Sequence, residues 1–282
     1  MFKNSSSENL KEQEIAFIST MNIELFNNFG KKFLSSFDEN AHTKIKLFNI
    51  FEGSNNISFG SDRIIQKIFY DEMHRTFLKH FSPLYEANGH RLQFIKEGER
   101  YKINYNYDFR WNAIKFSFKV FAINFCLQFI NDEKYLIWTD ADLICKKKFN
   151  ANSLIEFIPD QNELFSYLAR SHYPPKNPFS ECGFIIFNLK HNEFKNFIKR
   201  MIKIYTSGEI FSIQQWHDSW IWDHVRKEFE NEKKTKFKNI SGLYTNTEHP
   251  FVNCGLGEYF DHLKGDDRKK NGKSFEDDYV KS

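Results

Sequence analysis

The chain has 282 residues and a net charge of +3, from 40 basic and 37 acidic residues. This near balance excludes a molecule that attracts nucleic acid through its overall charge. Hydrophobic residues make up 40% of the chain and charged residues 27%, as in soluble globular proteins, and the length allows a sizeable core. Phe is frequent, with 33 residues, which an AT-rich genome would explain.

The sequence predicts a cytoplasmic protein without a transmembrane segment. Its first residues, MFKNSSSENLKEQE, are polar and lack the apolar core of a signal peptide. No apolar run approaches the ~20 residues that cross a bilayer. The cysteines form no CxxC pair, so we expect free thiols in a reducing compartment rather than structural zinc. They stand far apart in the sequence, as Cys126, Cys145, Cys182 and Cys254.

The first part of the chain predicts a strand, a helix and a second strand. Residues 15–22 are short and apolar, residues 26–37 carry phenylalanines at helical spacing, and residues 44–53 alternate like a strand. This order favours a βαβ unit with a parallel sheet. Residues 64–81 then predict one helix, and residues 91–98 another strand.

The rest of the chain continues the alternation of helices and strands. A long helix is predicted at 109–130 and a central strand at 134–140, and the lysine-rich residues 230–239 indicate a solvated turn. Between them we expect short elements, a helix at 153–158, strands at 164–170 and 181–191, and helices at 192–208 and 214–229. The whole predicts an α/β protein with one domain at 14–270, whose mixed, mostly parallel sheet is flanked by helices. A flexible leader, 1–13, would precede the domain, and a polar tail, 271–282, would follow it.

Two aspartates follow the predicted central strand, in the sequence YLIWTDAD. Asp140 and Asp142 share a face if the strand direction persists, because strand side chains alternate between faces. In open α/β sheets, ligands bind beyond the carboxyl ends of the strands. Two carboxylates that converge there repel each other unless a cation lies between them. The pair therefore predicts a site for Mg²⁺ or Mn²⁺ that holds a diphosphate, with a surface turn as the alternative.

Three local features resemble nucleotide-sugar-dependent glycosyltransferases of the GT-A fold. The helical RWNAIKFSFKVFAI precedes YLIWTDAD, and SECGFIIFNLKH is similar to the xxGFxxFN strand of these enzymes. Near the end, DHLKGDDRK is similar to the HxxGxxK element of the glycogenin-like and bacterial galactosyltransferase-like retaining family. His262 and Gly265 match its His and Gly, but Arg268 stands where Lys is usual, with Lys269 beside it. The resemblance implies a single Rossmann-like GT-A domain.

The resemblance also implies a metal centre and a donor site. Asp142 would bind Mn²⁺ or Mg²⁺ directly, Asp140 would bind the metal or the donor ribose, and His262 would complete the protein ligands. The donor would be a UDP- or GDP-linked sugar, and the acceptor a carbohydrate or another hydroxyl compound. The residues expected to bind the donor are Thr20, Asn22 and Glu52 at the base, Arg110 and Lys115 at the ribose or phosphate, and Lys264, Gly265, Arg268 and Lys269 at the diphosphate.

The stereochemistry of transfer stays open at this stage. An inverting enzyme needs a base for the acceptor hydroxyl, and Asp218 or Glu181 is the candidate. A retaining enzyme needs none, because the departing phosphate accepts the proton, and the His-containing element near the end favours this course.

Three other functions are compatible with parts of the sequence. A phosphatase or phosphotransferase of the haloacid-dehalogenase type also ends a strand in DxD and would use Asp140 as its nucleophile. Its later acidic motif would be the GDD at 265–267, but the preceding YFDHLK is not the apolar strand that this motif should follow. A nucleotidyltransferase would need a Gly- and Arg-rich loop, which ISTMNIELF lacks. A carbohydrate-binding relic without activity is the third alternative.

Overall fold

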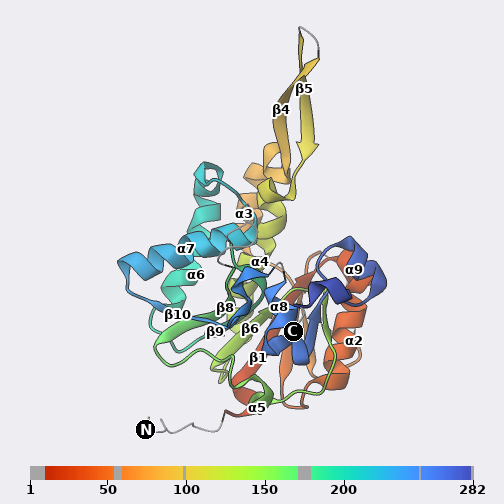
Figure 1. Ribbon diagram of the computed structural model, residues 1–282. Coiled ribbons are helices and arrows are strands. Elements are labelled where there is room, and N and C mark those ends of the chain that lie inside the picture. Colours follow the sequence, from red (N-terminus) through yellow and green to blue (C-terminus); the bar gives the residue numbers. More distant parts are fainter. Residues whose placement is uncertain (1–9, 54–58, 98–99, 171–178, 248, 281–282) are drawn as a thin grey trace. The chain divides into compact units, whose positions relative to one another are not determined.

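The computed structural model of the chain describes residues 10–53, 59–97, 100–170, 179–247 and 249–280. Most of the predicted leader lies outside these residues. The chain forms two compact units, and each is discontinuous in sequence (Figure 1). The sheet unit comprises Met1–Phe69, Cys126–Phe194 and Thr235–Ser282, and the helical unit comprises Tyr70–Phe125 and Lys195–Lys234.

Seven strands of the described part of the chain form the main sheet of the sheet unit. In order across the sheet they are β10 (Lys236–Asn239), β8 (Glu163–Leu168), β9 (Glu181–Asn188), β6 (Tyr135–Thr139), β1 (Ile15–Met21), β2 (Lys46–Phe51) and β3 (Ile64–Ile68). Strands β6, β1, β2 and β3 are parallel, β10 is parallel to β8, and β9 runs antiparallel to both of its neighbours. The predicted α/β class with a mixed, mostly parallel sheet is confirmed.

Phenylalanines fill the core of the sheet unit. Phe17 of β1 is fully buried, with ring centroids 5.2 Å from Phe37, 5.7 Å from Phe149 and 6.4 Å from Phe184. Phe37 belongs to α2 (Lys31–Asn40), which buries the apolar stripe that the helical spacing predicted. A short helix, α1 (Ile23–Leu25), and one π-helical turn lead into α2. Burying one such side chain stabilises the fold by roughly 1.5–3 kcal/mol.

A second, two-stranded sheet and the C-terminal residues complete the sheet unit. β7 (Leu143–Cys145) pairs antiparallel with β11 (Phe260–His262). The short helices are α5 (Ala151–Leu154), α8 (Pro250–Asn253) and α9 (Asp266–Asn271). The predicted polar tail packs on this unit, because the backbone N–H of Ser274 donates to Asp261 at 3.0 Å and Arg268 pairs with Asp278.

The helical unit contains α3 (Glu72–Phe81), α4 (Ala113–Cys126), α6 (Phe194–Thr206) and α7 (Asp218–Glu232). Its core joins Phe77, Phe121 and Tyr205, whose ring centroids lie 5.5–6.4 Å apart. A hairpin, β4 (His90–Glu97) and β5 (Arg100–Tyr107), forms the long ribbon coloured yellow in Figure 1. None of the helices in the described part of the chain has the length and hydropathy of a membrane span.

Three of the sequence predictions were wrong at this level. Residues 64–81 form β3 and then α3, because the isoleucines of β3 pair in parallel register with β2 and Asp71 caps a new helix at the N–H of His74. The predicted turn at 230–239 contains β10, an edge strand whose pairing with β8 a local pattern does not reveal. The helix expected at 214–229 begins only at Asp218.

Two buried histidines are expected to make the helical unit sensitive to acid. Desolvation lowers the pKa of His74 and of His217 to about 4. Since the unfolded groups titrate near 6.5, their neutral forms stabilise the fold fully above that pH, and this contribution is lost as the pH falls toward 4. We expect each histidine to lower the free energy of unfolding by about 2 kcal/mol between pH 7 and pH 5. Denaturant titrations at both pH values would measure the loss.

The matched variants for this prediction are available in the same unit. The double substitution His74→Gln and His217→Gln should reduce the pH dependence, whereas His80→Gln, at an exposed position, should leave it unchanged. An undiminished loss of stability in the double variant would contradict the assignment.

Candidate metal centre

Backbone pairing brings Asp140, Asp142 and His262 together at the carboxyl end of β6. The N–H of Asp140 donates to the carbonyl of Gly183 in β9 at 3.0 Å. His262 of β11 pairs with Leu143 of β7, and the N–H of Leu263 donates to the Asp142 carbonyl at 3.0 Å. One ligand atom from each of the three side chains lies within 4.8 Å of the others. Two separate strand pairings therefore bring together the three residues that the sequence predicted to share a site.

Each carboxylate of the pair has one oxygen held and one oxygen facing His262. The indole N–H of Trp138 donates to Oδ1 of Asp140 at 2.8 Å, and Nζ of Lys269 lies 2.9 Å from Oδ2 of Asp142. Nε2 of His262 lies 3.3 Å from Oδ1 of Asp142 and 3.9 Å from Oδ2 of Asp140. The 3.3 Å contact is an ion pair without hydrogen-bond geometry, so the buried Oδ1 faces the imidazole but accepts no hydrogen bond from any described residue. A buried carboxylate oxygen left in this way fits a cation ligand.

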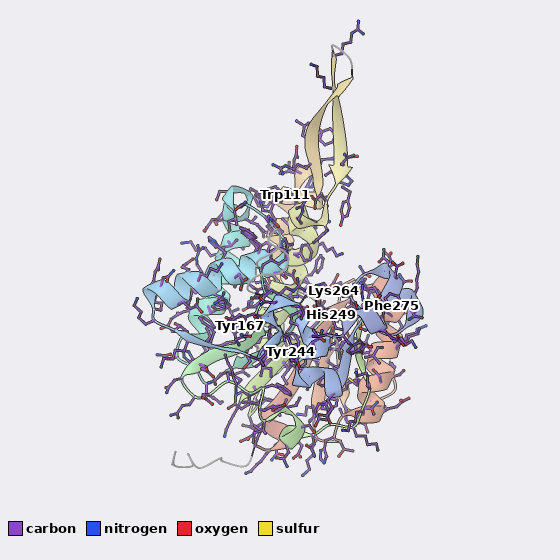
Figure 2. All side chains as sticks on the ribbon, viewed as in Figure 1. Trp111, Tyr167, Tyr244, His249, Lys264 and Phe275 are labelled. Atoms are coloured by element: carbon purple, nitrogen blue, oxygen red, sulfur yellow. The ribbon has the colours of Figure 1, made fainter. Side chains whose placement is uncertain are left out.

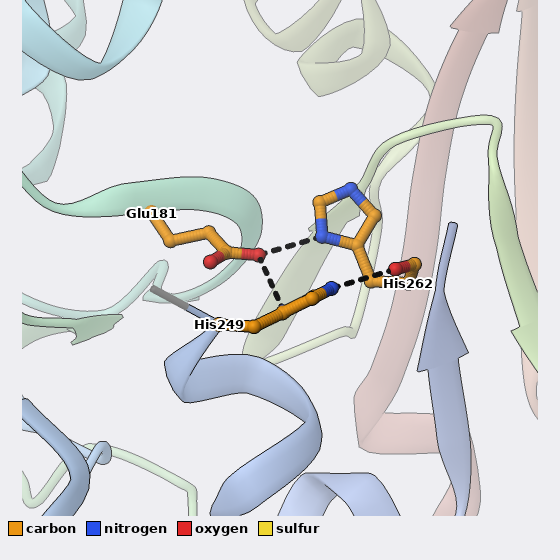
Figure 3. Close-up of side chains that lie close together, drawn as sticks. All are labelled: Glu181, His249 and His262. Atoms are coloured by element: carbon orange, nitrogen blue, oxygen red, sulfur yellow. Dashed lines mark hydrogen bonds and ion pairs between the residues drawn. The ribbon is translucent and has the colours of Figure 1, made fainter. Parts of the chain in front are cut away.

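A second set of residues holds the imidazole of His262 (Figure 3). Nδ1 of His262 lies 2.6 Å from Oε1 of Glu181, and Nε2–H of His249 donates to the His262 carbonyl at 2.9 Å. The same Oε1 lies 3.8 Å from Nδ1 of His249. A carboxylate on one imidazole nitrogen fixes the ring and leaves the other nitrogen for a metal. Glu181 thus directs Nε2 of His262 at the two aspartates.

Glu181 is itself neutralised by two basic residues. Arg170 lies 2.8 Å from its Oε2, and Nζ of Lys264 lies 3.7 Å from the same oxygen. Figure 2 labels Lys264 and His249 in this part of the sheet unit. Burial opposes ionisation of Glu181, but Lys264, His249 and the His262 hydrogen bond hold its pKa well below the ordinary value. The buried carboxylate is therefore charged and fully engaged with its neighbours.

The charges of the cluster are strongly polarised. Burial opposes the charge of Asp142, yet His262 and Lys269 lower its pKa below the ordinary range. Burial likewise opposes a charged imidazole, but Asp142 and Glu181 raise the pKa of His262 to about 10. A metal ligand must be the neutral imidazole, so a bound metal would replace this proton. Two carboxylates and an imidazole are a donor set that suits Mn²⁺ or Mg²⁺.

The residues expected at the nucleotide base lie at the carboxyl ends of β1 and β2. The register pairs Thr20 with Ile50, and the Thr20 hydroxyl has the Ile50 carbonyl at 2.8 Å and Oε1 of Glu52 at 2.9 Å as acceptors. Asn22 caps α1 by accepting the N–H of Leu25 at 2.9 Å. Thr20 and Glu52 are therefore together, whereas the side chain of Asn22 has a structural partner; the three base contacts remain predictions.

The basic residues near the end of the chain separate into two groups. Lys264 and Lys269 lie at the cluster through Glu181 and Asp142. Arg268 instead pairs with Asp278 and also donates to the Lys264 carbonyl at 3.1 Å. Gly265 precedes α9 with a φ of 82°, a conformation that favours glycine. Lys264 and Lys269 therefore contact the cluster and Arg268 does not in these ion pairs, and which basic residue would bind a diphosphate stays a prediction.

The remaining candidates belong to the helical unit. Arg110 forms an ion pair with Asp108, with Nη2 2.6 Å from Oδ2, and Nζ of Lys115 lies over the Phe116 ring. Asp218, the first residue of α7, forms a buried ion pair with Lys119. Burial opposes the charge of Asp218, but Lys119 lowers its pKa overall. The donor and catalytic roles of these residues stay predictions.

Three residues of the site were not singled out from the sequence: Trp138, Arg170 and His249. Trp138 stands two positions before Asp140, so strand alternation carried a signal for it. Arg170 follows β8, and its partner Glu181 begins the antiparallel β9, a link that needs the strand order. His249 stands in EHPF, which has no pattern that indicates its contacts.

No protein-family model and no curated protein matches the chain. The chain is similar to mouse xyloside xylosyltransferase 1, with 13% identity, 80% of this chain and 84% of that chain covered, and a TM-score of 0.41. A glycosyltransferase involved in the glycosylation of the major capsid of PBCV-1 is 10% identical, with 91% and 98% covered and a TM-score of 0.46. Glycosyltransferase GlyE of Streptococcus pneumoniae TIGR4 is 12% identical, with 83% and 46% covered and a TM-score of 0.39. All three of these similar proteins are glycosyltransferases.

Proposed function

We propose that the protein is a metal-dependent glycosyltransferase that moves a sugar, a hexose by preference, from a nucleoside-diphosphate sugar to a carbohydrate or another hydroxyl acceptor. The observation that carries the proposal is the cluster of Asp140, Asp142 and His262 beyond β6, with the buried Oδ1 of Asp142 left without a hydrogen bond. Such a site at the carboxyl end of an open α/β sheet is where this fold class binds ligands.

The cluster could stabilise the negative charge that develops on the leaving group during glycosyl transfer. The bond between the anomeric carbon and the diphosphate breaks, so positive charge grows on the sugar and negative charge on the leaving group. A divalent metal, held by Asp140, Asp142 and His262, supplies Lewis-acid stabilisation of that leaving group when bound. Lys264 and Lys269 would donate charge-assisted hydrogen bonds to the same oxygens.

The surroundings of Glu181 and Asp218 support a retaining course. Glu181 is 4% exposed and is bound by Arg170 and His262, and Asp218 is paired with Lys119. A carboxylate whose pKa is lowered by a fixed cation is a weak base. We therefore propose that Glu181 positions His262 rather than deprotonating the acceptor, and that the departing diphosphate takes the acceptor proton.

No described contact favours the haloacid-dehalogenase alternative. That chemistry needs Asp140 as a nucleophile, whereas Oδ1 of Asp140 accepts the Trp138 indole N–H. The acidic pair that would supply its later motif, Asp266 and Asp267, is exposed in the first turn of α9.

Ligand-dependent stabilisation would test the proposal. We expect Mn²⁺ with UDP or GDP to raise the melting temperature of the wild-type protein, because a ligand at 100 times its Kd adds about 2.7 kcal/mol to the stability. Mn²⁺ with a simple phosphoester should give no comparable shift. The reverse pattern, stabilisation by phosphoesters and none by nucleoside diphosphates, would favour the phosphatase. A panel of sugar nucleotides, assayed for Mn²⁺-dependent hydrolysis, would then name the donor.

A further inference from the structure

Lys269 holds one oxygen of the carboxylate whose other oxygen, Oδ1, would bind the proposed metal. Its Nζ lies 2.9 Å from Oδ2 of Asp142, and the two side chains are 27% and 12% exposed. The same Nζ lies 4.8 Å from the centroid of the Phe29 ring, in cation–π range. The ammonium group is therefore held on one side by a carboxylate and on the other by an aromatic face.

The charges around the cluster are nearly balanced without a metal. Besides His262, the carboxylates of Asp140, Asp142 and Glu181 are surrounded by three basic side chains, those of Arg170, Lys264 and Lys269. A divalent cation that approaches Asp142 meets the ammonium group of Lys269 on the same carboxylate, and the two cations repel. Binding of the divalent cation becomes favourable when an anion such as a diphosphate binds with it and compensates the added positive charge.

Of Arg268 and Lys269, only Lys269 has a side chain that is able to move to a bound anion. Arg268 is fixed by Asp278 and by its hydrogen bond to the Lys264 carbonyl. Lys269 has a flexible four-carbon stem, a single acidic partner at hydrogen-bond distance among the described residues, and partial exposure. It can therefore leave Asp142 for a nearby anion at small structural cost.

We propose that Lys269, held on Oδ2 of Asp142, opposes by its charge the binding of a metal at Oδ1 of the same carboxylate, and that Lys269 passes to the diphosphate of the donor when the metal binds. This inference rests on the function proposed above. Lys269 therefore weakens the binding of metal alone and strengthens the binding of nucleoside diphosphate. Binding of the two ligands becomes coupled, because the metal drives Lys269 away from Asp142 and the diphosphate gives Lys269 a new partner.

The test is the substitution Lys269→Met, which keeps the stem and removes the charge. Isothermal titration would measure the Kd of Mn²⁺ without nucleotide, and the Kd of UDP and of GDP at saturating Mn²⁺. We expect Lys269→Met to bind Mn²⁺ alone about 10-fold more tightly than wild type and the nucleoside diphosphate about 10-fold more weakly, a coupling of ordinary size. Lys270→Met is the matched control, since exposed Lys270 on the same helix carries the same charge.

The two opposite changes distinguish this role from a structural ion pair. If Lys269→Met binds Mn²⁺ no more tightly than Lys270→Met, or more weakly than wild type, Lys269 does not compete with metal and the inference is overturned, while Mn²⁺ binding by wild type leaves the proposed function standing. If wild type binds no Mn²⁺ even with nucleoside diphosphate, both fail. Lys269→Gln, with the same readouts, replaces Lys269→Met should that variant not fold.

Discussion

Asp142→Asn is expected to lower sugar transfer by at least about 10²-fold, equivalent to about 2.7 kcal/mol of transition-state stabilisation. The amide keeps the size of the side chain and one oxygen, but it removes the negative charge that faces Nε2 of His262 and Nζ of Lys269. Without that charge the cluster has one carboxylate and an imidazole beside a lysine. We therefore expect Mn²⁺ binding to be lost together with turnover.

The measurement pairs Mn²⁺ titration with an assay of sugar-nucleotide turnover on the same preparation. Asp267→Asn is the control, because Asp267 is an exposed carboxylate on α9 and loses the same charge. A melting temperature close to that of wild type would show that the fold is intact. Turnover that survives Asp142→Asn with its metal dependence would refute the metal assignment.

Gly183→Ala is expected to weaken Mn²⁺ binding by about 10- to 100-fold through His262, the range seen when the support of a metal ligand is lost. A Cβ atom at Gly183 would lie 2.5 Å from Cε1 and 2.9 Å from Nε2 of the His262 ring. That ring is held by Glu181 at 2.6 Å and by its strand pairing with β7, so it cannot move without losing one of these contacts. The methyl group turns Nε2 away from the aspartates or displaces β9.

Gly60→Ala provides the matched control for this prediction, since a Cβ there meets no atom within 4 Å. Mn²⁺ titration and thermal unfolding of both variants separate the two possible responses. Weak metal binding with a preserved melting temperature indicates a turned imidazole, and a large loss of stability indicates a displaced strand. Wild-type Mn²⁺ affinity in Gly183→Ala would show that His262 is not a ligand.

The strand, helix, strand order at the start of the chain was predictable because short-range spacing carries it. The phenylalanines of α2 recur at helical spacing, and β1 and β6 are apolar runs typical of strands buried on both faces. The same spacing failed at 64–81, where an apolar run is compatible with both a helix and a strand. There, pairing with β2 decided in favour of β3.

The arrangement of the candidate site depends on strand direction and register, which no local pattern contains. Because β9 runs antiparallel to β6, its first residues, Glu181 and Gly183, lie beside the last residues of β6 and next to Asp140. Because β11 pairs with β7, His262 lies beside Asp142 although 120 positions separate them in the sequence. As a result, Glu181 forms an ion pair with His262. Lys269, on the helix α9 that follows β11, forms one with Asp142.

The sequence by itself determined the α/β class and the placement of two aspartates directly after a buried strand, since both follow from side-chain periodicity over a few residues. The resemblance of the DHLKGDDRK segment added His262 to these aspartates. Only the tertiary structure decided which carboxylate holds that imidazole and which lysine pairs with Asp142. The physical reason is that these contacts form between segments far apart in the chain, and hydrogen-bond register between strands, rather than local preference, determines which side chains meet.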